Sequence, residues 1–165
     1  KMQIKNNLLS ENQMIMLENT IGSDEFPWYF NNNVVDKLEP NEKFQFTHTF
    51  YRNFKVVSDW YRHVTPILEI LKPMALIRIK ANLQPHSFKT VKQSPHIDYK
   101  SDNDTNIITA IFYVNTNNGY TYFMDGTEIK SERNKIIMFD SNKLHAGTTC
   151  TDQKRRMVIN FNYIK

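Results

Sequence analysis

The sequence has 165 residues, of which 40% are hydrophobic and 13% aromatic, so it can bury one sizeable core and is too short for two. Its net charge is +4 and its basic residues are spread along the chain, which excludes the long basic run typical of many nucleic-acid binders. A single cysteine, Cys150, excludes an intramolecular disulfide, and no apolar run approaches the roughly 20 residues of a membrane span. We therefore expect one domain, residues 1–165, in the cytoplasm and without a membrane partner.

The first predicted element is a helix from Ser10 to about Ile21. Ser10 suits the N-cap, because its hydroxyl can accept a hydrogen bond from a free backbone N–H of the first turn. Three apolar residues follow at helical spacing and form one face: Met14, Leu17 and Ile21. Gly22 is expected to end the helix.

A second helix is predicted from about Phe54 to Leu71. Apolar residues recur there on one helical stripe, namely Val57, Trp60, Tyr61, Val64, Ile67, Leu68 and Leu71. Pro66 lies inside the run, so we expect a break or kink near it. Between the helices, residues 26–35 and 44–53 are dense in aromatic and β-branched residues, which is consistent with short strands or extended arms.

From residue 74 onward the hydrophobic period becomes two. In residues 74–82 apolar side chains alternate with Arg78, Lys80 and Asn82, as in a strand with one buried face. Further strands are predicted at residues 106–115, 120–124, 135–140 and 156–164, with turn signals at 117–119 and 125–126. Helices followed by strands predict an all-β core with flanking helices: helical support over about residues 1–73, and a sheet or barrel over about 74–164.

The triplet His96-Ile97-Asp98 is the first candidate for a metal site. On a strand, His96 and Asp98 would project from the same face, a spacing that suits two ligands of one metal. Alone the triplet is a weak signal, and a solvated loop histidine beside a capping aspartate is the competing interpretation. His145, after the strand at 135–140, can supply a third ligand. Two histidines and one carboxylate are typical of non-haem iron(II) sites, whereas a structural zinc would have a closed tetrahedral set.

If two open positions on such a metal are taken by the 2-oxo acid end of a dicarboxylate, its far carboxylate needs a cation. An arginine gives a bidentate, charge-assisted pair. Arg155 and Arg156 both follow His145. Strand alternation favours Arg156, which shares a face with Val158, Asn160 and Asn162, whereas Arg155 shares one with Met157, Ile159, Phe161 and Tyr163.

His96, Asp98, His145 and the following arginine, in a strand-rich half behind N-terminal helices, resemble the Fe(II)- and 2-oxoglutarate-dependent oxygenases, and among them the prolyl 4-hydroxylase-like branch. Residues 106–123, NIITAIFYVNTNNGYTYF, are similar to the family's strand ending in Tyr-Leu-Asn, followed by a glycine turn and Thr-x-Phe. Residues 135–147 resemble the strand and turn that carry the distal histidine. The resemblance covers about residues 74 to 164. The interval from His145 to Arg156 is a little longer than is common in this branch, so Arg155 remains an alternative for the arginine that binds the distal carboxylate.

The resemblance implies a double-stranded β-helix (jelly-roll) fold and an enzyme that uses Fe(II), 2-oxoglutarate and O2. It implies that His96, Asp98 and His145 bind iron, and that Arg156 and Tyr113 hold the distal carboxylate of 2-oxoglutarate. Tyr113 is otherwise an ordinary half-buried strand tyrosine. Further candidates for co-substrate contacts are Arg155, Asn82 and Thr109.

The resemblance also implies a reaction: oxidative decarboxylation of 2-oxoglutarate coupled to hydroxylation of a substrate C–H bond, in a protein or peptide side chain such as proline. The basic loop at residues 84–95 lies at the expected mouth, and loops of this kind commonly carry recognition. It leaves open a nucleic-acid base as substrate, as in the demethylating branch. A non-catalytic binding module on the same fold and a cupin-type metal protein compete with the oxygenase interpretation.

Overall fold

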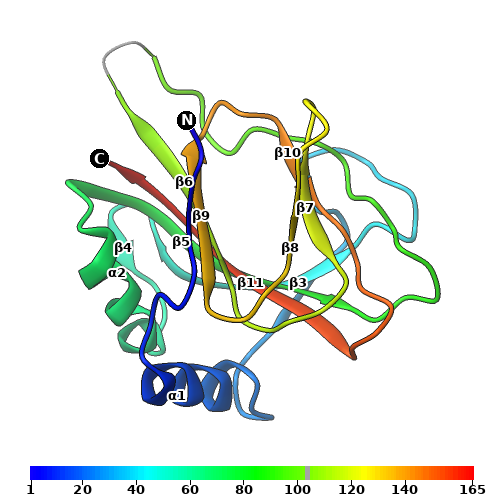
Figure 1. Cartoon of the computed structure of the whole chain (residues 1–165), viewed down its shortest axis with the longest axis horizontal. Coiled ribbons are helices and arrows are strands. Elements are labelled where there is room, and N and C mark those ends of the chain that lie inside the picture. Colours follow the sequence, from blue (N-terminus) through cyan, green and yellow to red (C-terminus); the bar gives the residue numbers. More distant parts are fainter. Residues whose placement is uncertain (103–104) are drawn as a thin grey trace.

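A computed structural model describes residues 1–102 and 105–165 (Figure 1). Its helices are α1 (Glu11–Ile21), α2 (Thr65–Leu71) and a single 3-10 turn, η1 (Tyr61–His63). Its strands are β1 (Gln3–Lys5), β2 (Tyr29–Asn31), β3 (Gln45–Arg52), β4 (Lys55–Val56), β5 (Ala75–Pro85), β6 (Ile107–Tyr113), β7 (Tyr120–Phe123), β8 (Glu128–Lys130), β9 (Lys135–Asp140), β10 (His145–Gly147) and β11 (Arg155–Ile164). In the part of the chain that is described, no helix has the length and apolar character needed to cross a membrane.

The strands form two antiparallel sheets. The large sheet has the order β1-β9-β6-β11-β5-β3-β2, with β4 added to β3, and the small sheet has the order β10-β7-β8. Figure 1 shows α1 and α2 on the opposite side of the large sheet from β7, β8 and β10. The large sheet is therefore covered by helices on one face and by the small sheet on the other.

Alternation along the central strands fills both faces of the large sheet. On β6, Phe112 belongs to the core that includes Leu17 of α1, whereas Ile111 and Tyr113 belong to a second cluster with Phe123 of β7. Successive residues of a strand point to opposite faces, so one strand contributes to both clusters. The second cluster lies at one side of the space between the sheets, and polar side chains occupy the rest of that space.

The first predicted helix is observed with the expected ends. Ser10 is its N-cap and forms a capping box with Gln13: the Ser10 hydroxyl accepts from the backbone N–H of Gln13, whose side chain accepts from the backbone N–H of Ser10. Gly22 is its C-cap. The three predicted apolar residues are its buried ones, Met14, Leu17 and Ile21.

The second predicted helix is much shorter than expected. Asn53 and Phe54 both have positive φ, +50° and +61°, and form the turn between β3 and β4 instead of starting a helix. Helical structure begins only at η1, and Pro66 lies in the first turn of α2. Proline is tolerated there because its missing N–H has no partner within the helix anyway. The proline therefore begins the regular helix instead of kinking a longer one.

The division into a helical first part and a β second part needs a second correction. β3, in the segment expected to hold short strands or arms, has eight residues and pairs with β5 inside the large sheet. The segment over about residues 1–73 thus supplies two helices and four strands, β1 to β4, within the described residues. The expected all-β core with flanking helices is observed, but this core includes strands from both halves.

Buried His48 gives a testable pH dependence of stability. Its Nδ1 lies 2.8 Å from the carbonyl oxygen of Pro27 and its Nε2 2.6 Å from Oγ of Ser58. Burial lowers the pKa of His48 below its usual 6.5. In the window below about 6.5 the unfolded chain binds a proton that the folded chain does not, so the free energy of unfolding falls as the pH falls. We expect urea unfolding of His48→Gln between pH 7.5 and 5.5 to lose part of this slope, which is at most about 1.4 kcal/mol per pH unit for one group. An unchanged slope in the variant would show that His48 titrates freely.

Candidate metal and co-substrate site

The two histidines are brought together by their own backbones. The N–H of His96 donates to the carbonyl oxygen of His145 and the N–H of His145 to that of His96, each over 3.0 Å. This pair is an isolated bridge, because His96 lies in the segment between β5 and β6 and not on a regular strand. The bridge fixes the separation of the two side chains, whose ring centres are 4.7 Å apart.

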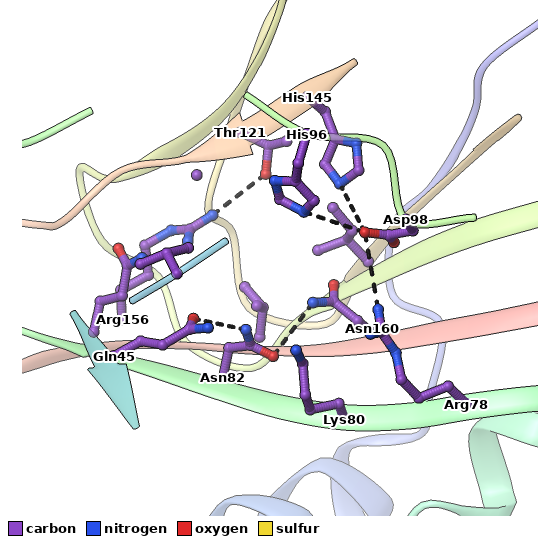
Figure 2. A pocket seen from close by; sticks show the side chains of 15 residues that line it. Gln45, Arg78, Lys80, Asn82, His96, Asp98, Thr121, His145, Arg156 and Asn160 are labelled. Atoms are coloured by element: carbon purple, nitrogen blue, oxygen red, sulfur yellow. Dashed lines mark hydrogen bonds and ion pairs between the residues drawn. The ribbon is translucent and has the colours of Figure 1, made fainter. Parts of the chain in front are cut away.

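Asp98 completes a group of three potential ligands around one point. Its Oδ1 lies 3.2 Å from Nε2 of His96 and 3.7 Å from Nε2 of His145 (Figure 2). One donor atom from each of the three residues lies within 4.8 Å of the others. Two imidazole nitrogens and one carboxylate oxygen suit a metal such as iron(II) that keeps open positions.

His145 has the form that metal binding requires. Nδ1 of His145 lies 2.9 Å from the carbonyl oxygen of Lys143 and donates to it, which leaves Nε2 with a free lone pair directed at Asp98. Burial, with His145 only 4% exposed, lowers its pKa. His145 is therefore neutral at physiological pH.

Asp98 is held by hydrogen bonds on the side away from the histidines. The hydroxyl of Thr109 donates to its Oδ2 over 3.0 Å, and Nδ2 of Asn162 donates to the same oxygen over 2.9 Å. Burial alone would raise the pKa of Asp98, but the hydrogen bond from His96, the charge of Arg78 and the hydrogen bond from Asn162 hold that pKa far below its usual range. The group remains a carboxylate, and a metal bound at Oδ1 would replace the hydrogen bond from His96.

Arg156, at the start of β11, is a buried cation that lines the same cavity. It is 4% exposed, and its Nε donates to Oγ of Ser131 over 2.8 Å while Nη2 lies 3.3 Å from Oγ1 of Thr121. Among residues 1–102 and 105–165 no carboxylate forms an ion pair with it. A buried charge that lacks a counter-charge is costly. Because no carboxylate of the described chain offsets the cost of burying this charge, an anionic ligand is expected beside Arg156.

Tyr113 belongs to the same hydrogen-bonded group. Its hydroxyl donates to Oγ1 of Thr121 over 2.8 Å, and its ring lies 5.9 Å from the guanidinium carbon of Arg156. Burial raises the pKa of Tyr113 to about 12, so it stays a hydrogen-bond donor at any physiological pH. Arg156 and the Thr121 hydroxyl line the cavity and can hold a carboxylate, whereas Tyr113, expected to contact that carboxylate directly, donates to Thr121 instead.

Two glycines leave room for the Arg156 side chain. A Cβ added at Gly147 would lie 2.9 Å from Nη1 of Arg156, and one added at Gly119 would lie 2.6 Å from its Cδ. Such contacts are closer than carbon atoms tolerate, so the absence of a side chain at both positions allows the guanidinium to lie between the sheets.

The cavity between the two groups is lined by carboxamides. Nδ2 of Asn82 donates to Oε1 of Gln45 over 2.8 Å, and Nδ2 of Asn160 lies 3.3 Å from Oδ1 of Asn82 (Figure 2). Oε1 of Gln84 and Oδ1 of Asn160 are buried and have no hydrogen-bond partner in the described chain. Both atoms are acceptors, so they need a donor such as water inside the cavity. The fit to a dicarboxylate comes from the two ends of the cavity: Arg156 and the Thr121 hydroxyl suit one carboxylate, and a metal held by Asp98 and the two histidines suits the other end.

The other sequence candidates lie at different places. The guanidinium of Arg155 donates to the carbonyl oxygen of Gly22, at the end of α1, on the helical side of the sheet. Thr109 contacts Asp98 and not the part of the cavity near Arg156. Asn82 does line the cavity. Asn160, on the strand face of Arg156 that was expected to line a site, lines the cavity as well. Sequence reasoning missed three polar lining residues: Gln45, Gln84 and Thr121. Thr121 lies in the Thr-x-Phe match, whereas Gln45 carries no signal.

Thr109 allows a test of how Asp98 is positioned. Thr109→Val keeps the side-chain shape but removes the hydroxyl that donates to Oδ2. Loss of such a supporting hydrogen bond typically lowers metal affinity about 10- to 100-fold. We expect this decrease in an iron(II) or manganese(II) titration, with no change for Thr90→Val on the exposed loop. Equal affinities for the two variants would contradict a role of Thr109 in holding Asp98.

A family model matches the second half of the chain. Residues 83–164 match the model of the 2OG-Fe(II) oxygenase superfamily, and this range contains the three candidate metal ligands, Tyr113 and Arg156. The chain belongs to this superfamily. The oxygenase is thus an Fe(II)- and 2-oxoglutarate-dependent dioxygenase, and its two sheets form the double-stranded β-helix of these enzymes.

Solved structures with the same fold cover almost the whole oxygenase. A prolyl hydroxylase from Trichoplax adhaerens, in complex with a peptide fragment of hypoxia inducible factor, has a TM-score of 0.66 and 12% identity, over 98% of this chain and 83% of that one. A prolyl-4-hydroxylase from Pseudomonas putida has a TM-score of 0.60 and 11% identity, over 99% and 92%. The alpha ketoglutarate dependent epimerase SnoN of nogalamycin biosynthesis has a TM-score of 0.67 and 10% identity, over 98% of this chain and 76% of that one. No curated protein matches the sequence of the oxygenase.

Proposed function

We propose that this oxygenase hydroxylates a C–H bond in a peptide or protein side chain such as proline, with His96, Asp98 and His145 as iron ligands and Arg156 as the anchor of 2-oxoglutarate. The observation that carries the site assignment is the pairing, in one cavity, of a His-Asp-His group with a buried arginine that lacks a counter-charge. The peptide substrate is supported by the likeness to two prolyl hydroxylases, one of them bound to a peptide.

Each part of the site has a separate task in this proposal. When bound, iron(II) supplies the activation of O2, coupled to decarboxylation of 2-oxoglutarate to succinate. Arg156 and Thr121 orient the distal carboxylate, while Tyr113 fixes the Thr121 hydroxyl by donating to it. Thr109 and Asn162 hold Asp98 so that its Oδ1 faces the histidines. The chain itself moves no proton in these tasks; it binds, orients and limits the access of water.

The first experiment tests the metal and co-substrate site without a substrate. Under anaerobic conditions, iron(II) and 2-oxoglutarate together should give the weak visible charge-transfer band of a bidentate complex. The band should be lost in His96→Ala and in Asp98→Ala. Absence of the band and of iron or 2-oxoglutarate binding in the wild type would refute the assignment.

The second experiment tests the reaction. Incubation with proline-containing peptides, iron(II), 2-oxoglutarate and O2 should give a +16 mass shift that is absent when alanine replaces proline in the same peptide. Succinate formation should rise with the shift. A parallel panel of methylated oligonucleotides, read as loss of a methyl group, tests a nucleic-acid base as substrate. Lack of succinate formation with every panel would favour a binding module.

A further inference from the structure

Two cations of β5 face the site from the side opposite to Arg156. Arg78 and Lys80 are two residues apart on β5, so their side chains leave the same face of the sheet. In the register of β5 with β11, Gln84 is opposite Arg156, Lys80 is opposite Asn160, and Arg78 is opposite Asn162. At about 3.3 Å per residue, the backbone of Lys80 lies about 13 Å along β5 from that of Gln84. The two cations therefore lie at the other end of the cavity from the arginine that is proposed to anchor 2-oxoglutarate.

Both side chains line the inner cavity and also the hollow outside it. The outer hollow is bordered by Arg78, Lys80, His96, Ile97, Asp98 and three residues of the segment between β2 and β3, Val34, Val35 and Asp36. Figure 2 shows the Lys80 side chain reaching up toward the cavity beside Asn160, and the Arg78 guanidinium below Asp98. A substrate that approaches the metal ligands through the outer hollow must pass these two cations.

Within the described residues, the ammonium group of Lys80 has no hydrogen-bond or ion-pair partner. Across residues 1–102 and 105–165, its Nζ makes no hydrogen bond or ion pair, although the side chain is half-buried. Burial and then the charge of Arg78 lower the pKa of Lys80 to about 8. An anion that enters the hollow stabilises this half-buried ammonium, because its attraction offsets part of the hydration free energy that burial removes.

Arg78 is fixed in place beside it. Its Nε donates to Oδ1 of Asn162 over 3.1 Å, its Nη2 lies 3.8 Å from Oδ1 of Asp98, and its guanidinium stacks over the ring of Tyr99 at 5.3 Å. These contacts orient the guanidinium and still leave N–H groups free for a ligand, since a guanidinium has five donors. The same Asp98 oxygen faces the metal position, so its charge is only partly available to Arg78.

The charges around the cavity and hollow leave a positive surplus. The charged side chains that line them are three cations, Arg78, Lys80 and Arg156, and two carboxylates, Asp36 and Asp98. The charges of iron(II) and of 2-oxoglutarate cancel each other. One positive charge therefore remains, at the end of the cavity where Arg78 and Lys80 lie. A single anionic group on the substrate would neutralise it.

We propose that Arg78 and Lys80 form a subsite for an anionic group of the substrate, a carboxylate or a phosphate, close to the carbon that is hydroxylated. The inference rests on the proposed function and narrows its substrate class: the preferred peptides are acidic next to the hydroxylated residue. Arg78 gives a planar, two-pronged contact to such a group and Lys80 a point charge.

A binding selection without turnover tests the subsite. The protein is loaded with zinc(II), which has no redox chemistry, and with 2-oxoglutarate, and is exposed to a library of five-residue peptides with central proline. The flanking positions carry Asp, Glu, phosphoserine, Asn, Gln, Ser or Ala, and retained peptides are identified by mass spectrometry. We expect acidic peptides to be enriched about 10-fold or more. This enrichment corresponds to about 1.4 kcal/mol or more of binding free energy from the ion pair that the peptide forms with the unpaired cation. Comparison of the Asp/Glu and phosphoserine arms identifies the preferred anion.

Three variants complete the test. The enrichment should disappear in Lys80→Gln and fall in Arg78→Gln, and it should persist in Lys89→Gln, which removes an exposed lysine from the loop at residues 84–95. Zinc content is measured in each, because Arg78 contacts Asp98. Retention of acidic and neutral peptides in equal amounts, retention of no peptide, or an enrichment that Lys80→Gln leaves intact would overturn the subsite. A loss of 2-oxoglutarate binding in Lys80→Gln, with peptide preference unchanged, would likewise overturn it and make Lys80 a co-substrate contact.

The two proposals fail in different ways. A +16 shift on proline peptides of any charge, without acidic preference, would keep the hydroxylase and reject the subsite. Retention of acidic peptides without any +16 shift under iron(II), 2-oxoglutarate and O2 would keep the subsite and reject proline hydroxylation.

Discussion

Arg156→Gln is expected to remove saturable 2-oxoglutarate binding. Loss of one partner from a buried, hydrogen-bonded charge pair costs about 2 to 5 kcal/mol, which corresponds to a decrease in affinity of roughly 30-fold or more. Anaerobic titration of the iron(II) protein with 2-oxoglutarate, followed by the visible band, measures this directly. The affinity for iron in the absence of 2-oxoglutarate should not change, because Arg156 makes no contact with the three ligand residues in the described chain.

The preceding residue provides the matched control. Arg155→Gln removes an identical side chain from the same strand, but on the face where Arg155 donates to Gly22. It should leave 2-oxoglutarate affinity unchanged and lower the melting temperature slightly. Arg156→Gln should not destabilise the ligand-free protein, because it removes a buried charge that has no counter-charge. If the two variants bind 2-oxoglutarate equally well, Arg156 is not the anchor.

Asp98→Asn is expected to abolish activity through loss of iron. Asn has nearly the shape of Asp but no negative charge, and its amide nitrogen would face either the donors Thr109 and Asn162 or the metal. We expect iron(II) affinity to decrease by about 100-fold or more, since a ligand matters more than its supporting hydrogen bonds. Metal content after dialysis and equilibrium titration with iron(II) measure the decrease.

Asp140→Asn is the control for this substitution, because Asp140 is an exposed carboxylate at the end of β9. It should bind iron as the wild type does. Circular dichroism of both variants without metal should match the wild type and so separate metal loss from unfolding. Wild-type iron content in Asp98→Asn would place the metal elsewhere.

The face on which Arg156 lies could be predicted from sequence because β11 obeys strand alternation. Arg155 and Arg156 differ in sequence context only by parity, and the structure places the first against the end of α1 and the second in the cavity. A two-residue period is thus enough to predict on which face a side chain lies once the strand is known. The candidate ligands His96 and Asp98 come together with His145 although His96 lies outside the regular strands. The bridge between the two histidine backbones takes its place.

The parts that could not be predicted depend on contacts between distant segments. The stripe from Phe54 to Leu71 is periodic, yet Asn53 and Phe54 adopt positive φ, and Phe54 is 84% exposed. Pairing of β3 with β5 outweighs the helical pattern at that end. Gln45 enters the site only because β3 lies beside β5, and nothing local in the sequence indicates which strand is its neighbour. The surroundings of Arg78 and Lys80 likewise depend on both neighbours of β5, which alternation along β5 alone does not specify.

The mutual backbone hydrogen bonds of His96 and His145 give the metal site a rigidity of its own. Each amide donates to the other residue's carbonyl, so the two imidazoles are held at their separation by the main chain and not by a metal. Such a site loses little conformational entropy when iron enters. The same two amides act as a natural reporter: in amide hydrogen exchange of the metal-free protein they should already be protected, and iron should slow their exchange only by the amount that it stabilises the surrounding fold.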